Sequence, residues 1–225
     1  MKPDMRTLQD QHVLVIGLGL SGLAMARWCV RQGAQVTVAD TRENPPQRGA
    51  LLRDCPQVAF VAGALDANLM ARHTWTLIAR SPGLTPAELA AVQAWALEHA
   101  VPLVGELELF AQALQALSRR ERLPYRPRVL AITGTNGKTT VTALSSLLLQ
   151  RAGVRVATAG NIGPSLLDVL SAALDVEAVA QAEDDAREAQ EAAHAAALAE
   201  AGAMAAGNKA PILEPEAEPE FEAMN

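Results

Sequence analysis

The feature that most constrains the fold is a glycine-rich loop between a short apolar strand and a helix near the start of the chain. Residues 13–16 (Val-Leu-Val-Ile) form an apolar run typical of a buried parallel strand, and Gly17-Leu-Gly-Leu-Ser-Gly22 follows directly. A helix is expected over residues 21–32, and a second strand over 35–39 ends at Asp40. This order predicts an α/β unit that binds a phosphate-bearing ligand through the loop amides and the helix N-terminus.

The alternation of strands and helices continues as far as residue 117. We expect strands at 58–62, 76–79 and 102–104, and helices at 87–99 and 106–117. Residues 1–117 are therefore predicted to form a small Rossmann-like α/β domain with a doubly wound parallel sheet.

Residues 118–128 are rich in arginine and proline, and we interpret them as a solvated linker. Nucleic-acid or membrane-surface binding is the weaker interpretation, because the segment offers one tyrosine for stacking and no basic helix.

A second loop of the same kind follows the linker. It reads Gly134-Thr-Asn-Gly-Lys-Thr-Thr140, with an expected strand at 129–133 before it and a helix at 141–151 after it. Lys138 suits the β- and γ-phosphates of a nucleoside triphosphate, and the Thr139 hydroxyl suits Mg²⁺. The strict P-loop pattern has glycine where this chain has Ile132, so the loop is a shorter variant. We predict an ATP site made of Gly134, Thr135, Asn136, Gly137, Lys138, Thr139 and Thr140.

The second unit is too small to be a complete domain. After the helix it offers one more strand, at 154–157, and a helix at 165–174. Two parallel strands need neighbours and covered faces that these residues cannot provide. Residues 129–174 are therefore predicted to be the incomplete start of a P-loop α/β domain.

Charge divides the chain into a body and a tail. Residues 1–174 carry 17 Lys and Arg against 12 Asp and Glu, whereas residues 175–225 carry 2 against 13. The tail is rich in alanine and glutamate and has almost no large apolar side chains before residue 208. It is predicted to be a solvated helix or disordered, with disorder from residue 208 onward.

Cysteine usage and hydropathy favour a soluble, cytoplasmic protein. Cys29 and Cys55 do not make a disulfide framework, and no Cys or His cluster has metal-ligand spacing. The first apolar run, residues 13–20, is too short for a membrane span.

The ligand of the first loop stays open at this level. Asp40 could hold a ribose hydroxyl, as in dinucleotide-binding proteins, or Thr41 and Arg42 could hold a phosphate or a uracil-type edge. An NADP-dependent oxidoreductase would use Arg42 but would leave Lys138 without a role. A non-catalytic nucleotide-binding module is the other alternative.

Taken together, the motifs resemble the Mur ligases, which build the peptide of peptidoglycan precursors and so serve cell-wall growth, cell shape and cell division. The resemblance covers about residues 10–172. It rests on the two loops and on shorter motifs in matching order: Asp40-Thr-Arg42, Ser81-Pro-Gly83, Gly105-Glu-Leu-Glu-Leu-Phe110 and Gly160-Asn-Ile-Gly163. Another amide ligase with the same ATP loop, such as a folylpolyglutamate synthase, fits less well because of the N-terminal glycine-loop domain.

The resemblance implies an ATP- and Mg²⁺-dependent amide ligase. ATP would phosphorylate the carboxylate of UDP-N-acetylmuramoyl-L-alanine, and the amine of D-glutamate would attack the acyl phosphate. Lys138, Thr139 and Asn161 would then act at the reacting end, with Thr139 on the metal. The UDP moiety would be held by Gly19, Leu20, Ser21, Thr41, Arg42 and Gly83.

The chain departs from the family after Leu174. The family continues there with a strand carrying a Mg²⁺-binding Glu, then a metal-binding His, a carbamylated Lys and a third domain, and no such motif follows here. His194 and Lys209 match none of them. We expect an incomplete copy, or a chain that ends inside an insertion, with no ligase turnover by itself. A monomer is expected.

Overall fold

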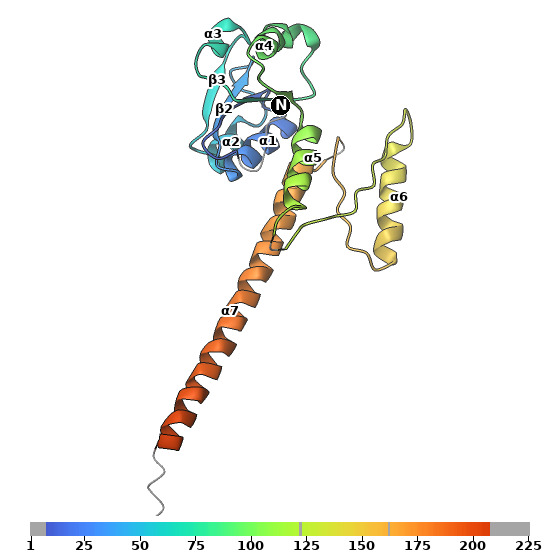
Figure 1. The fold of residues 1–225 in the computed structure, drawn as a ribbon. Coiled ribbons are helices and arrows are strands. Elements are labelled where there is room, and N and C mark those ends of the chain that lie inside the picture. The colour runs from blue at the N-terminus through green and yellow to red at the C-terminus, as the bar shows by residue number, and fades with distance from the viewer. Residues whose placement is uncertain (1–7, 122, 162, 208–225) are drawn as a thin grey trace, which may run out of the picture. The chain divides into compact units, whose positions relative to one another are not determined.

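The computed structural model describes residues 8–121, 123–161 and 163–207, with side chains described as far as residue 200. The chain divides into two compact units, residues 1–174 and 175–225. The first unit contains a five-stranded sheet and most of the helices (Figure 1).

All strands of the sheet are parallel, in the order β3-β2-β1-β4-β5. Their bounds are β1 His12–Ile16, β2 Gln35–Asp40, β3 Ala59–Ala62, β4 Leu77–Arg80 and β5 Leu103–Val104. The chain runs from β1 outward through β2 to β3, and then crosses to β4 on the other side of β1. Residues 13–16 of the central strand are completely buried, which explains why they are apolar without alternation.

Helices cover both faces of this sheet. One core cluster joins the sheet to α1 (Leu20–Arg31), α2 (Arg48–Asp54) and α5 (Glu106–Leu117). The other cluster joins it to α3 (Ala67–Met70) and α4 (Pro86–Glu98). A capping box of Thr85 and Glu88 starts α4, and the Asp66 carboxylate caps α3. This is the doubly wound domain that the sequence predicts.

The strands lie within one residue of their predicted positions, and α1, α4 and α5 agree equally well. The short helices α2 and α3 were not predicted. The aromatic and thiol side chains predicted for the core include Trp28, Trp75 and Cys29, and each is at most 4% exposed. Trp95, also predicted for the core, is only partly buried against the second cluster.

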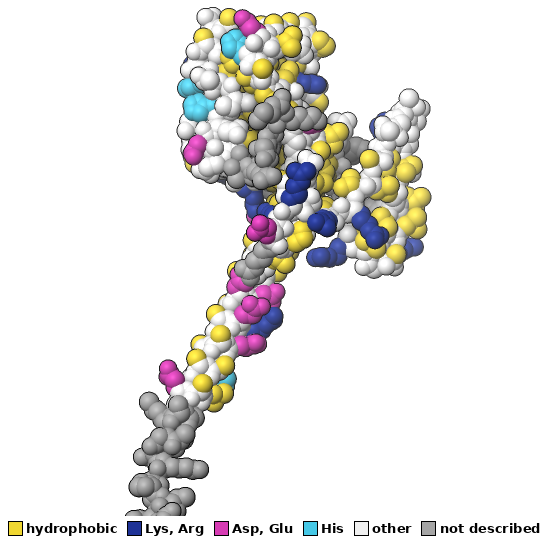
Figure 2. All heavy atoms as spheres, in the orientation of Figure 1, with side chains coloured by type: hydrophobic (Ala, Val, Ile, Leu, Met, Phe, Trp, Pro, Cys, Tyr) yellow, Lys and Arg dark blue, Asp and Glu magenta, His cyan; other side chains and the backbone are white. Residues whose placement is uncertain are grey.

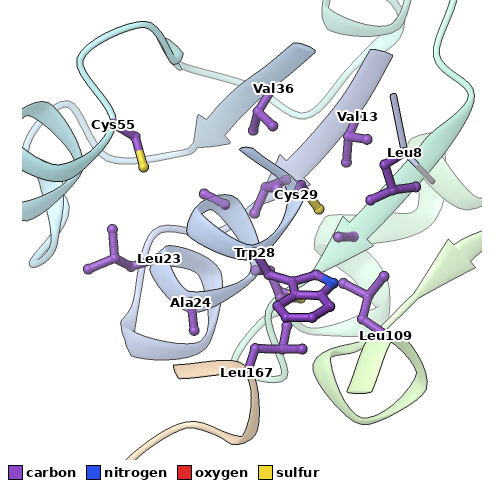
Figure 3. Packing of buried hydrophobic residues seen from close by; sticks show 14 of the residues in the cluster. Leu8, Val13, Leu23, Ala24, Trp28, Cys29, Val36, Cys55, Leu109 and Leu167 are labelled. Carbon is purple, nitrogen blue, oxygen red and sulfur yellow. The ribbon is translucent and has the colours of Figure 1, made fainter. Parts of the chain in front are cut away.

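The first turns of α7 (Leu166–Gly207) pack on the Rossmann-like domain. Leu167, Leu170 and Leu174 are buried in the cluster that contains α1 and α5. Figure 3 shows Leu167 beside the Trp28 ring, with Leu109 of α5 close by. Asp168 accepts hydrogen bonds from Arg27 of α1 at 3.2 and 3.3 Å. The spacing of these leucines gives a helix face, which explains why the segment docks through one side.

The predicted strands at 129–133 and 154–157 are wrong, because neither segment is a strand in the structure. Helix α6 (Lys138–Arg151) forms between them, beginning before the predicted start at residue 141, and has no buried residue. Val129, Leu130 and Val154 are 49–66% exposed, and Figure 2 shows hydrophobic side chains at the surface around α6. A parallel strand is stable only with hydrogen-bonded neighbours, and no neighbour for these segments exists among the described residues.

Residues 175–207 of the second unit continue α7 as a helix, one of the two states expected for the tail. Their alanines favour helix, and acidic side chains lie along the described part of the surface (Figure 2). The disorder predicted for residues 208–225 lies outside the described residues. Within the described part of the chain, no helix combines the length and the apolarity needed to cross a membrane.

Candidate functional site

Three of the predicted binding segments meet at the carboxyl ends of adjacent strands. Residues 17–21 follow β1, residues 40–42 end and follow β2, and residues 81–83 follow β4. Backbone hydrogen bonds tie them together: the Gly17 N–H donates to Ala39 O at 2.8 Å, and the Ser81 N–H donates to Ile16 O at 2.8 Å. Strands β2 and β3 lie on one side of β1, and β4 and β5 lie on the other, so the strand order reverses between β1 and β4. Ligands of open α/β sheets bind at such a switch point.

Glycine is required at two positions of the first loop. Gly17 has φ +87°, and a Cβ there would lie 2.9 Å from the Ser81 Cβ. A Cβ at Gly22 would lie 1.8 Å from the backbone oxygen of Gly17. The first glycine lets the loop pass close to residues 81–83, and the last lets α1 start directly over the loop. Gly19, by contrast, has open space around it, as a position that faces a ligand would.

Asp40 stabilises the loop from inside the domain. Its side chain is 3% exposed, and Oδ2 accepts the Leu18 N–H at 2.7 Å. Both carboxylate oxygens also accept hydrogen bonds from the Arg42 guanidinium at 2.8 Å. The Arg42 guanidinium and the Leu18 amide lower the pKa of Asp40 to about 2. Because protein donors already engage both oxygens, the geometry favours a loop-supporting role over a ribose contact.

This lowered pKa predicts a pH-dependent effect of Asp40→Asn. The folded-state pKa lies below the unfolded value, so the carboxylate stabilises the fold above about pH 4 and this contribution disappears as the pH falls through about 2. We expect a pH-dependent contribution of about 1–2 kcal/mol, since Arg42 is partly solvated. Urea unfolding of wild type and Asp40→Asn at pH 5 and pH 2.5 measures it. A stability difference that is the same at both pH values would contradict the assigned role.

The remaining predicted UDP-site residues are accessible. Leu20 is 69% exposed, and Thr41, Arg42 and Gly83 are also exposed, whereas Gly19 and Ser21 are half-buried. The backbone N–H groups at the start of α1 and the Arg42 guanidinium are therefore available to an anionic ligand.

The predicted ATP residues form a separate loop at the start of α6. Gly137 has φ +75°, which lets the chain turn directly into the helix at Lys138. The Lys138 ammonium donates to the carbonyl oxygens of Gly134 and Thr135, so it lies over the loop. A lysine folded over a loop that ends in a helix N-terminus is an arrangement that fits a polyphosphate. These hydrogen bonds, and that of the Thr142 hydroxyl to Lys138 O, all lie within residues 134–142.

Asn161 lies in a third place, an exposed turn before α7. The Gly163 N–H donates to Gly160 O at 2.9 Å, and the Gly160 N–H donates to Pro164 O at 3.0 Å. The turn is thus closed on itself, and Asn161 is held at its exposed tip.

Sequence reasoning missed one residue of this region, Glu106 of α5. Its carboxylate accepts a hydrogen bond from the Ser21 hydroxyl and another from the Leu167 N–H, the latter at 3.3 Å. The sequence alone assigns no site role to Glu106, because a carboxylate in the first turn of a helix is also explained as a favourable charge at a helix N-terminus. Glu106 stands in the Gly105–Phe110 motif, which was the available signal.

Metal binding by side chains alone is not supported. Among the residues that the structure describes, no group of three or more His, Cys, Asp or Glu could hold a metal ion. Mg²⁺ at nucleotide sites typically takes one or two protein ligands and completes its shell with phosphate oxygens and water. The exposed Thr139 hydroxyl fits that kind of shared site.

A doubly wound parallel sheet with a glycine loop at its switch point defines a protein of the open α/β class. Two family descriptions match the chain: the N-terminal domain of MurD-like Mur ligases over residues 11–105, and the Mur ligase middle domain over residues 132–216. The chain belongs to the Mur ligase family.

Curated relatives agree with the family assignment. UDP-N-acetylmuramoylalanine–D-glutamate ligase of Albidiferax ferrireducens is 56% identical over 166 residues, which is 74% of this chain and 32% of the relative. The enzyme of the same name from Burkholderia vietnamiensis is 52% identical over 173 residues, 76% of this chain and 34% of the relative. The chain therefore spans about a third of the length of these relatives.

Among solved structures, a pseudomurein peptide ligase type C from Methanothermus fervidus is 25% identical. The match covers 66% of this chain and 28% of that one, with a TM-score of 0.37.

Proposed function

We propose that the Rossmann-like domain binds the UDP end of UDP-N-acetylmuramoyl-L-alanine, as part of a ligase that adds D-glutamate to this substrate. The observation that carries the proposal is the meeting of residues 17–21, 40–42 and 81–83 at the switch point of the sheet. The named activity of relatives that are 52–56% identical over three quarters of the chain supports the choice of substrate.

Each part of the UDP moiety has a chemically suitable neighbour. The α1 N-terminus and the amides of Gly19, Leu20 and Ser21 suit the diphosphate. Thr41 and Arg42 present a hydroxyl and a guanidinium that suit phosphate or uracil oxygens, and the salt bridge to Asp40 orients Arg42. Gly83 lets the backbone of the third segment approach the ligand closely.

For the second loop we propose ATP binding. Lys138 would contact the terminal phosphates, Thr139 would contribute a hydroxyl to Mg²⁺, and the amides of residues 134–140 would cradle the anion. ATP supplies the phosphoryl group that activates the substrate carboxylate for attack by the D-glutamate amine. Asn161 would approach the reacting end.

A non-catalytic nucleotide-binding module is the second candidate, and one observation favours it. Helix α6 has no buried residue and the segments beside it form no strands, so the ATP loop is not held by a sheet. We therefore expect no turnover from the polypeptide of residues 1–225 by itself. D-Glutamate-dependent phosphate release from ATP and the UDP substrate would contradict this expectation. The proposed setting is a cytoplasmic monomer.

Ligand-induced thermal stabilisation of Arg42→Ala tests the proposed site. Wild type should gain several degrees in melting temperature with saturating UDP-N-acetylmuramoyl-L-alanine. Loss of a charge-assisted hydrogen bond should weaken binding by about 10- to 100-fold and remove most of that gain in Arg42→Ala.

Arg72→Ala, which replaces an exposed arginine after α3, is the matched control and should keep the gain. Equal stabilisation of wild type and Arg42→Ala by the ligand would exclude Arg42 from the site.

A further inference from the structure

Three helix N-termini converge on the carboxylate of Glu106. Glu106 is the first residue of α5, Ser21 lies in the first turn of α1, and Leu167 lies in the first turn of α7. One carboxylate oxygen accepts the Ser21 hydroxyl and the other accepts the Leu167 N–H. A negative charge is favoured at each of these N-termini, because the unpaired N–H groups of a helix give that end a partial positive charge.

Glu106 takes the place of a normal cap on α7. Ser165 precedes the helix and is the residue type that usually accepts its first N–H groups. Among the residues that the structure describes, its buried hydroxyl nevertheless has no hydrogen-bond partner. The carboxylate from a helix 61 positions earlier in the chain satisfies the Leu167 N–H instead. An N–H group of the first turn of α7 is therefore capped by the Rossmann-like domain and not by Ser165.

We propose that Glu106 is a positioning residue that couples the glycine loop of the UDP site to the turn that carries Asn161. Ser21 belongs to the predicted UDP site, and Leu167 follows the closed turn of residues 160–164 by three positions. The carboxylate thus joins the part of the site assigned to the UDP end to the part assigned to the reacting end. The role of this link in substrate binding rests on the proposed function. The hydrogen-bonded link between Ser21 and Leu167 through Glu106 does not.

A second set of contacts keeps the geometry of this link fixed. Arg27 of α1 bridges Asp54 of α2 and Asp168 of α7, and Leu167 packs on Trp28. These contacts hold α7 against α1 irrespective of Glu106. Removing the Glu106 carboxylate should therefore uncouple the loop from the turn without releasing the helix.

Glu108 provides a matched control on the same helix. It also lies in the first turn of α5, but its carboxylate accepts a hydrogen bond from Gln112, four residues further along that helix. If Glu106 acted only as a favourable charge at the start of α5, alanine at either position would have the same effect.

The first test uses the ligand-free chain and follows the Leu167 amide by NMR with ¹⁵N-leucine. Glu106→Ala should speed exchange of this amide by about tenfold, the loss of one hydrogen bond. Glu106→Gln keeps an oxygen that can accept the Leu167 N–H, so exchange of this amide should be slow again. In Glu108→Ala the exchange rate of the Leu167 amide should equal that of wild type. Ser21→Ala should shift the Leu167 cross-peak through the shared carboxylate. Unchanged exchange in Glu106→Ala, or no shift in Ser21→Ala, would overturn the coupling.

The second test adds UDP-N-acetylmuramoyl-L-alanine to the same samples, with binding followed by calorimetry. The ligand should slow Leu167 exchange in wild type and Glu108→Ala but not in Glu106→Ala. Binding without any change at Leu167 in wild type would overturn the coupling to the UDP site. Absence of binding would overturn the proposed function, and the ligand-free test would still decide whether Glu106 links the two segments.

Discussion

Gly22→Ala is expected to have the largest effect of any single methyl group added to the chain. The new Cβ would lie 1.8 Å from the Gly17 backbone oxygen, far inside van der Waals contact, and no side-chain rotation can relieve a clash with backbone. Either α1 or the loop must move. We expect a loss of about 3 kcal/mol or more in the free energy of unfolding, and loss of UDP-substrate binding, because the displaced segment carries the ligand-facing amides. Urea unfolding and calorimetry measure the two effects.

Gly49→Ala is the control for this substitution. Gly49 lies in α2 with nothing within 4 Å of an added Cβ, so alanine there should leave binding unchanged and stabilise the helix by about 0.5–1 kcal/mol. If Gly22→Ala has the same free energy of unfolding as Gly49→Ala and still binds the ligand, α1 does not start against the loop as described.

Leu167→Ala has the second largest expected effect. Leu167 is completely buried beside Trp28, although it lies about 140 positions away from it in the chain. Truncation leaves a cavity between α7 and α1, which the ion pair of Arg27 and Asp168 also joins. We expect a loss of about 3 kcal/mol in the free energy of unfolding, measured with urea.

Leu198→Ala removes the same atoms from an exposed position of α7, 60% accessible, and should change stability by less than about 0.5 kcal/mol. A similarly small effect of Leu167→Ala would mean that the first turns of α7 do not dock on the Rossmann-like domain in solution.

The Rossmann-like domain was predictable because its signals are local. Residues 13–16 are buried on both faces and therefore apolar throughout, and the glycines of the first loop mark the turn into α1. The helices α2 and α3 escaped prediction because they are short, at seven and four residues, and show no clear periodicity. For α3 the Asp66 cap was the one available signal.

The two wrong strands, at 129–133 and 154–157, show the limit of the same reasoning. Their β-branched composition favours strand, but a strand also needs hydrogen-bonded partners, and local sequence carries no information on whether those are present. The candidate site was also predictable only in its local parts. The glycine loops could be predicted from the sequence, whereas the Glu106 contacts join residues 85 and 61 positions apart and required the tertiary structure.

The most direct measurement is a calorimetric titration of the purified chain with UDP-N-acetylmuramoyl-L-alanine, alongside NADP⁺ as the control ligand. The proposed function predicts that the uridine nucleotide binds at a single site and that NADP⁺ does not bind. Binding of NADP⁺ without the uridine nucleotide would contradict the assignment of the glycine loop to a UDP substrate and would favour an oxidoreductase site.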